Sequence, residues 1–271
     1  MRVSLRIVCT ALLVTVSLLS GAPSNPTPAL ANETDQGTVS MEWLGHMFFR
    51  FVSPSGTVVV TTPNFDYGPA PIRLAELGHV DLVLIPNGHG DDRGDVLAVA
   101  AANQNATVLS PGMLGAWLVE QGLNSSQLVT TQPGNTHTIS GVRVRTVVNV
   151  HSENISGTDP VAFGGTAGYI ITFENGWTVY YAASSDIHMD MQLYGSIFKP
   201  HAALLNCSGR DPELVAHMAR LVSTDNPNLN TVVCTHIRFG DRAAERVGEE
   251  IRKLGLSVRV LEPAPGEVFN Y

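Results

Sequence analysis

The sequence of 271 residues has little charge of either sign and few long apolar runs. Charged residues make up 15% of the chain, and 16 Lys and Arg stand against 24 Asp and Glu, which gives a net charge of −8. No cluster of basic residues is visible, so we expect no binding to nucleic acid, because phosphate recognition needs Lys and Arg. Beyond residues 7–19, no apolar segment is long enough to cross a membrane.

The one apolar run has the features of a secretory signal peptide. Arg2 and Arg6 flank its start, and Ala29-Leu30-Ala31 fits a cleavage site of the A-x-A type. The run is shorter than the ~20 residues that span a bilayer, which disfavours the alternative of a membrane anchor. We therefore predict that residues 1–31 are a signal peptide, and that the protein is periplasmic or secreted and not attached to the membrane after cleavage.

Removal of 31 residues would leave 240 of the 271, which suits a single α/β domain over residues 32–271. The loss of Arg2 and Arg6 would change the net charge from −8 to −10. We expect a soluble, acidic domain that acts on a small molecule.

Only three cysteines are present, and one of them, Cys9, lies in the predicted signal peptide. Cys207 and Cys234 would remain in an oxidising compartment, and each lies near the end of an apolar strand. They can form a disulfide if those strands are neighbours. Two alternatives stay open: a pair of buried thiols that act as small apolar groups, or Cys207 as a metal ligand.

The mature chain contains two halves, each with strands followed by helices. The first half has predicted strands at 39–53, 57–62, 81–86 and 107–109, and helices at 71–78, 95–103 and 112–121. The second half has strands at 137–140, 142–150, 169–173, 177–182, 202–206, 231–235 and 257–261, and helices at 212–222 and 242–254. This order predicts an α/β fold, an αββα sandwich with two mixed β-sheets face to face and helices outside.

Polar side chains follow four of the predicted strands, where α/β proteins usually build their sites. Imidazole and carboxylate groups together suit Zn²⁺, Mn²⁺ or Fe²⁺. Four strand ends that each supply a ligand type therefore indicate a metal site. The candidate ligands are His89, Asp91, Asp92, His151 and His236, with Ser184 and Asp186 after the strand at 177–182.

Five segments, in this order, resemble the metallo-β-lactamase superfamily. Residues 43–46 read W-L-G-H, residues 81–95 resemble D-L-V-L-x-T-H-G-H-x-D-H-x-G-D, and residues 147–152 resemble V-P-x-x-H-S. Residues 178–191 resemble T-V-Y-H-A-G-D-T-x-x-x-x-D-M, and residues 231–236 resemble the strand that ends in the last His. The likeness covers residues 38–262 and is greatest to the small metal-dependent hydrolases related to ascorbate-6-phosphate lactonase. It implies the metallo-β-lactamase fold.

The resemblance also implies a two-metal site that this chain has altered. His89 and His151 would belong to the first metal, and Asp91 and His236 to the second. Five positions depart from the family pattern: Asn87 and Asp92 replace histidines of H-x-H-x-D-H, Ser184 stands where an Asp bridges the metals, Thr62 replaces a supporting Asp, and Tyr181 replaces a His.

The remaining groups suffice for a single ion. We expect His236 and Asp91 to bind it together with either His151 or Asp92, and His46 to line the pocket. Asp186 could reach the ion if its loop differs. The mono-zinc subclass of the superfamily similarly has Asn in place of the first His. Zinc is the expected metal, and a more oxygen-rich ligand set would favour Mn²⁺ or Fe²⁺.

The chemistry that the resemblance implies is hydrolysis of a small ester, lactone, amide or phosphoester. A divalent ion polarises the scissile group and lowers the pKa of its water towards ~7. Asp91 or His89 would then orient or deprotonate that water. The alternative is a catalytically degenerate member of the fold that acts as a binding module, because a fold does not determine a function.

Overall fold

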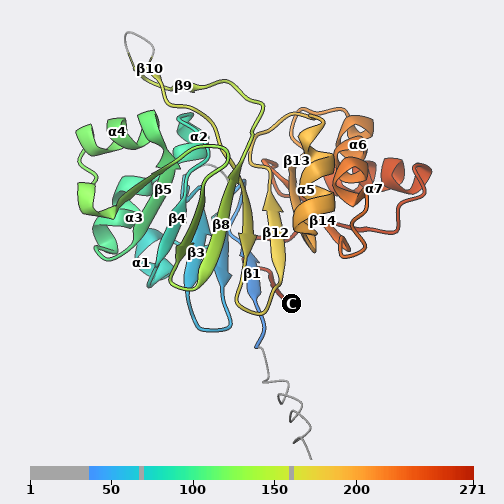
Figure 1. Ribbon diagram of the computed structural model, residues 1–271, viewed down its shortest axis with the longest axis horizontal. Helices are drawn as coiled ribbons and strands as arrows, with labels where there is room; N and C mark the ends of the chain where they lie inside the picture. Colours follow the sequence, from blue (N-terminus) through green and yellow to red (C-terminus); the bar gives the residue numbers. More distant parts are fainter. Residues whose placement is uncertain (1–36, 67–69, 159–161) are drawn as a thin grey trace, which may run out of the picture. The chain divides into compact units, whose positions relative to one another are not determined.

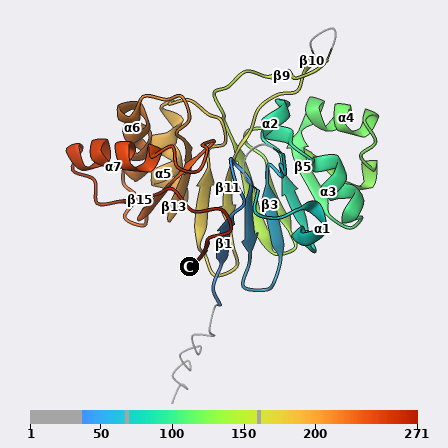
Figure 2. The same ribbon diagram turned by 180° about the vertical axis from the view of Figure 1, so that it is seen from behind.

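A computed structural model describes residues 37–66, 70–158 and 162–271 of the protein. These residues belong to one compact unit. Two β-sheets lie at its centre, with helices on the outer side of each (Figures 1 and 2). The predicted αββα sandwich is confirmed. The predicted signal peptide, residues 1–31, lies outside the described residues.

The first sheet has seven strands in the order β16-β1-β2-β3-β4-β5-β6. Strands β3 to β6 are parallel, and the pairs β16-β1, β1-β2 and β2-β3 are antiparallel. The strands are β1 (Ser40–Trp43), β2 (Phe49–Val52), β3 (Val58–Thr61), β4 (Leu82–Leu84), β5 (Thr107–Pro111), β6 (Leu128–Thr131) and β16 (Val268–Asn270). The carboxyl ends of the parallel strands share one edge, and residues 87–95 begin there.

The second sheet also has seven strands, in the order β15-β14-β13-β12-β11-β8-β7. Strands β12 to β15 are parallel, and the other pairs are antiparallel. The strands are β7 (Thr136–Ile139), β8 (Val142–Val147), β11 (Gly168–Thr172), β12 (Thr178–Tyr181), β13 (Ala202–Asn206), β14 (Thr231–Thr235) and β15 (Arg259–Leu261). A small ribbon, β9 (Asn154–Ile155) with β10 (Ala162–Phe163), lies between β8 and β11 in the sequence.

Helices α1 (Leu74–Leu77), α2 (Gly90–Arg93), α3 (Val96–Ala102) and α4 (Gly112–Glu120) lie with the first sheet, and a 3-10 turn, Ser125–Gln127, follows them. Helices α5 (Asp190–Phe198), α6 (Pro212–Ser223) and α7 (Ala243–Lys253) lie with the second sheet. Close contact between α5 and α6 depends on Gly195, since a Cβ there would lie 2.1 Å from the Val222 carbonyl oxygen.

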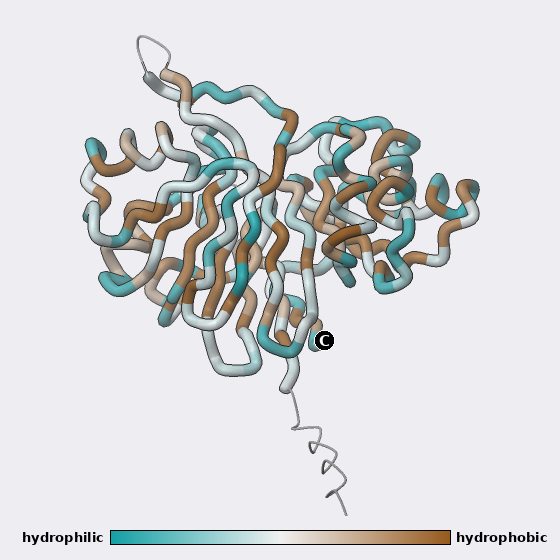
Figure 3. Tube along the Cα trace, viewed as in Figure 1, coloured by the Kyte–Doolittle hydropathy of each residue, from teal (hydrophilic) through white to brown (hydrophobic). Residues whose placement is uncertain are grey.

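The core fills the space between the sheets and under the helices. Apolar residues run along the strands of both sheets (Figure 3). Phe51 of the first sheet packs on Phe173, which directly follows β11 of the second sheet, with 5.8 Å between ring centroids. Tyr169 is fully buried, and its hydroxyl donates to the Ile85 carbonyl at 2.7 Å. This bond ties β11 to the chain just before the candidate metal loop.

The sequence-based prediction misses two helices, α2 and α5, and four strands, β6, β9, β10 and β16. In α5, Met191 and Tyr194 are buried, but Leu193 and Ile197 are 53% and 64% exposed. Apolar residues therefore lie on several faces of this helix and hide its period. The edge strand β16 has three residues and depends on pairing with β1, which local sequence does not reveal.

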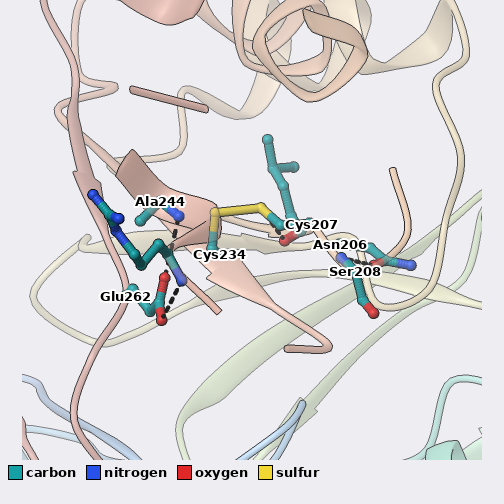
Figure 4. Close-up of a disulfide and its surroundings, with 8 residues drawn as sticks. Asn206, Cys207, Ser208, Cys234, Ala244 and Glu262 are labelled. Atoms are coloured by element: carbon teal, nitrogen blue, oxygen red, sulfur yellow. Dashed lines mark hydrogen bonds between the residues drawn. A yellow bond between two sulfur atoms is a disulfide. The ribbon is translucent and has the colours of Figure 1, made fainter. Parts of the chain in front are cut away.

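Cys207 and Cys234 form a disulfide (Figure 4). Cys207 directly follows β13 and Cys234 lies in β14, and the two strands are parallel neighbours with 5.4 Å between the cysteine Cα atoms. The disulfide alternative is confirmed, and the thiols are not free to bind a metal. The bond fixes the end of β14 two residues before His236.

Within the described part of the chain, no helix combines the length and the apolar character needed to cross a membrane.

Candidate metal centre

The candidate site lies where strand ends of both sheets meet. Its titratable groups form two clusters, and within each cluster the ligand atoms lie within 4.8 Å of one another. The first cluster contains His46, Asp91 and His236, and the second cluster contains His89, Asp92 and His151. The predicted ligands are therefore brought together, but in a grouping that differs from the predicted one. His46 joins Asp91 and His236, and Asp92 joins the other two histidines.

The main chain fixes the two histidines of the first cluster. His46 and His236 both have left-handed backbone conformations, with φ of 53° and 60°. The His236 amide donates to the His46 carbonyl at 3.1 Å, and the Trp43 indole donates to the same oxygen at 3.1 Å. Such strained conformations persist only where surrounding bonds hold them, and they are common at functional sites.

Asp91 comes from the single turn of α2, which packs against the end of β3. The Asp95 amide donates to the Pro63 carbonyl at 2.6 Å. At Gly94, which has φ of 50°, a Cβ would lie 2.0 Å from that carbonyl oxygen, so the close approach requires glycine. Arg93 donates to the Gly88 carbonyl at 2.9 Å and holds the start of the loop.

The first cluster has the spacing of metal ligands rather than of hydrogen-bond partners. Asp91 Oδ2 lies 3.4 Å from His236 Nε2 and 3.9 Å from His46 Nε2. Good hydrogen bonds to nitrogen measure about 2.7–3.2 Å. Ligand atoms at about 2.1 Å from a tetrahedral ion lie about 3.4 Å from one another. Two imidazoles and a carboxylate also form a common donor set, so these residues fit a divalent ion.

The surroundings set the charges of the first cluster. Burial, followed by repulsion from His236, lowers the pKa of His46 to about 3, so this ring is neutral. The contact with His236 lowers the pKa of Asp91 to about 2, against the effect of burial. Burial alone would lower the pKa of His236, but attraction to Asp91 and Asp92 outweighs it and the pKa is raised.

The second cluster has the spacing of a hydrogen-bonded group. His89 Nδ1 lies 3.1 Å from His151 Nε2, and His89 Nε2 lies 2.9 Å from both Ser152 Oγ and Asn154 Oδ1. Both ring nitrogens of His89 therefore have protein partners. Burial, followed by the neighbouring His89, lowers the pKa of His151. Sequence reasoning missed the contributions of Ser152 and Asn154, which lie one and three residues after His151.

Three of the five departures from the family motif contact one another. Asn87 Nδ2 donates to Asp92 Oδ2 at 2.5 Å, and Ser184 Oγ donates to the same oxygen at 2.6 Å. All three side chains are fully buried; we call them the buried triad. Burial raises the pKa of Asp92, and the two donors oppose this rise.

The other two departures also form a pair. Thr62 Oγ1 lies 2.7 Å from the Tyr181 hydroxyl, and both residues are buried. Thr62 directly follows β3 with a φ of 42°, and Tyr181 ends β12. This contact connects the first sheet to the second.

Asp186 does not belong to either cluster. Its carboxylate lies 2.8 Å from Arg210 Nη1, and Arg210 also donates to the Ser184 carbonyl at 3.1 Å. The loop thus directs Asp186 toward Arg210, a residue that sequence reasoning missed. Nothing local in the sequence marks Arg210, because it lies 24 residues beyond its partner.

A cavity of about 520 Å³ opens beside the first cluster. This volume suits a small organic molecule. His46 and His236 lie in its wall, and the other lining residues are Asp66, Ser208, Ile237, Arg238 and Asp241. The first cluster is therefore accessible to a substrate.

Residues 53–236 match the family described as beta-lactamase superfamily domain. The chain belongs to this superfamily. Among its relatives are proteins named UPF0173 metal-dependent hydrolase. The relative from Cupriavidus taiwanensis is 30% identical over 286 residues, which cover 96% of this chain and 99% of the relative. The relative from Herpetosiphon aurantiacus is 29% identical over 241 residues, 86% of this chain and 98% of the relative.

Solved structures agree on the fold. Igni18, a metallo hydrolase from Ignicoccus hospitalis, has a TM-score of 0.72 at 22% identity and covers 86% of this chain and 98% of its own. An isothiocyanate hydrolase from Delia radicum gut bacteria has a TM-score of 0.62 at 14% identity, with coverage of 86% and 98%. The predicted superfamily and fold are thus confirmed, within a family of metal-dependent hydrolases.

Proposed function

We propose that the protein is a secreted metal-dependent hydrolase that uses one divalent ion, held by His46, Asp91 and His236. The substrate is a small ester, lactone, amide or phosphoester. The observation that carries this proposal is the spacing of the first cluster, where 3.4 Å and 3.9 Å separate Asp91 Oδ2 from the two imidazoles. Family membership supports the reaction class.

The ion, when bound, would polarise the scissile bond and make water more acidic. The chain supplies the remaining functions. Neutral His46 and ionised Asp91 are in the protonation states that ligands need. His89 lies two residues from Asp91, and contact with His151 orients its ring. We assign proton transfer to His89, since imidazole is the commonest acid–base group near neutral pH.

Zinc suits the proposed ligands best, because two imidazoles and one carboxylate leave a fourth position open in a tetrahedral site. The alternatives Mn²⁺ and Fe²⁺ would require more oxygen ligands. Secretion is supported by the Cys207–Cys234 disulfide, since such bonds persist in oxidising compartments. Cell fractionation with an antibody against the protein tests this, and retention in the cytoplasm would contradict it.

Metal analysis tests the proposed function directly. The mature protein, equilibrated with Zn²⁺ and dialysed, should retain about one ion per chain. Asp91→Ala and His236→Ala should abolish binding, and His217→Ala, which changes a partly exposed histidine of α6, should not. Generic esters, lactones and phosphoesters should be hydrolysed by the loaded wild-type protein and the loaded His217→Ala control, and not by Asp91→Ala or His236→Ala.

One alternative function is a binding module without catalysis, which the loss of expected ligands at Asn87 and Ser184 favours. The same experiment separates the two. If no ion is retained, and Zn²⁺, Mn²⁺ and Fe²⁺ all fail to raise the unfolding temperature, the hydrolase proposal is wrong.

A further inference from the structure

The buried triad connects parts of the chain that are distant in sequence. Asn87 follows β4 of the first sheet, Asp92 lies in α2, and Ser184 follows β12 of the second sheet. Each side chain is fully buried, and all three meet at one oxygen, Asp92 Oδ2. The triad is thus a polar joint between the two sheets, immediately beside the metal ligand Asp91.

We propose that the buried triad takes the structural place of a second metal ion, so that it holds Asp91 in position without a metal. The three residues act as positioning residues. This inference rests on the proposed function, because it assumes that the first cluster binds the ion.

The three side chains depend on one another. Asp92 accepts a hydrogen bond from each of the other two, and Asn87 Oδ1 accepts from the His89 amide at 2.9 Å. Removal of either donor leaves a buried carboxylate with fewer partners, which is costly in an apolar environment. Replacement of one member therefore disturbs the joint as a whole.

The departures from the family motif are also matched to one another. Asn87, Asp92 and Ser184 bond within the triad, and Thr62 bonds to Tyr181 at 2.7 Å. Every altered position thus has another altered position as its partner. If the five ligand and support residues had been lost independently, some of the new side chains would contact residues that still match the family motif. A single alternative hydrogen-bond network explains all five substitutions.

Among the residues that the structure describes, the second cluster is the remaining group of ligand atoms that could bind a second ion. There, hydrogen bonds occupy both ring nitrogens of His89 and the Oδ2 atom of Asp92. Asp92 Oδ1 is the exception: among the described residues it has no hydrogen-bond partner. Two ions per chain in the wild-type protein would therefore mean that the second cluster binds metal, and the proposal would be overturned.

Single substitutions test the joint in two ways. In chelator-treated protein, Ser184→Ala and Asn87→Leu should lower the unfolding midpoint. In the same variants, the Kd for Co²⁺ should rise by about tenfold or more, as for other residues that orient ligands. Ser184→Thr keeps the hydroxyl and should restore the affinity. The control is Ser110→Ala, which removes a buried hydroxyl of β5 and should change the Kd less than twofold.

A gain of function provides the complementary test. The triple variant Asn87→His, Asp92→His, Ser184→Asp should retain two ions per chain instead of one. If Ser184→Ala matches the Ser110→Ala control in both measurements, the proposal is overturned. A wild-type protein that binds no ion would contradict the proposed function alone, because the midpoints of chelator-treated variants still report on the joint.

Discussion

The two clusters of the metal centre contain the same kinds of side chain, two histidines and one aspartate, but they differ in spacing. In the first cluster, 3.4 Å and 3.9 Å separate the carboxylate from the imidazoles. In the second cluster, His89 and His151 lie 3.1 Å apart. The comparison teaches that residue type alone does not identify a metal ligand. The distances between donor atoms, and their existing partners, separate ligation from hydrogen bonding.

The neighbours of the carboxylates explain this difference. Asp91 is 24% exposed and faces two imidazoles beside the cavity. Asp92 is fully buried and already accepts two hydrogen bonds through one oxygen. Adjacent residues of one short helix therefore have different surroundings: Asp91 is the proposed ligand of the ion, and Asp92 joins the sheets through its hydrogen bonds.

Substitution of one histidine in each cluster should have the largest effects. His46→Ala removes a ligand, so the Kd for Zn²⁺ should rise by more than about 100-fold, beyond the loss typical of residues that only orient ligands. His89→Ala should leave the Kd within about tenfold but lower kcat by about 10²–10⁴, as expected for loss of an acid–base group. Calorimetric titration and steady-state kinetics measure the two quantities.

The opposite result for the two histidines would contradict the assignment of the ion to the first cluster. If His89→Ala abolishes metal binding and His46→Ala does not, the ion lies in the second cluster. His79→Ala serves as a control for both variants, because that imidazole is 65% exposed and pairs with Asp81 away from the site.

Reduction of the disulfide should affect the first cluster more than the second. The bond closes a loop over a sequence separation of 27, for which chain entropy predicts about 3–4 kcal/mol of stability. Because Cys234 lies two residues before His236, reduction should also weaken metal binding. Chemical denaturation with and without reductant measures the first effect. The Cys207→Ser, Cys234→Ser double variant should show no further change on reduction.

The pH dependence should have opposite signs with and without metal. The raised pKa of His236 means that its protonated form stabilises the metal-free protein. This contribution is complete below the unfolded pKa of 6.5 and is lost as the pH rises through the folded pKa. An ion requires neutral His236, so its affinity should increase over the same range. Unfolding midpoints relative to His236→Gln, and Kd values from pH 6 to 9, test both signs; an affinity that is independent of pH would contradict them.

The sequence predicted most of the fold and the members of the site, but not their grouping. Strands with strong apolar patterns, such as β13 and β14, match residue for residue. The positions of His89, Asp91, His151 and His236 after predicted strands also identify them as site residues. The position of His46 beside His236 depends on a bond between two left-handed residues, 190 positions apart, which no local pattern encodes. Asp92 lies in a different cluster from the one predicted. Its position depends on the contact with Ser184, which is 92 residues away in the sequence and equally hidden from local patterns.

Substitutions in the pair Thr62 and Tyr181 should have the smallest effect on stability. Their effects on the free energy of unfolding should also depend strongly on each other. Thr62→Val and Tyr181→Phe each remove one hydroxyl of a buried 2.7 Å contact, so each should cost about 1 kcal/mol of unfolding free energy. The double variant should cost less than the sum of the two, because the hydroxyl left unpaired in either single variant is then absent. Metal affinity should change little, since the pair supports both sheets but contacts neither cluster through a hydrogen bond. Strict additivity in denaturant titrations would show that the two departures are independent, and it would remove them from the matched network to which Asn87, Asp92 and Ser184 belong.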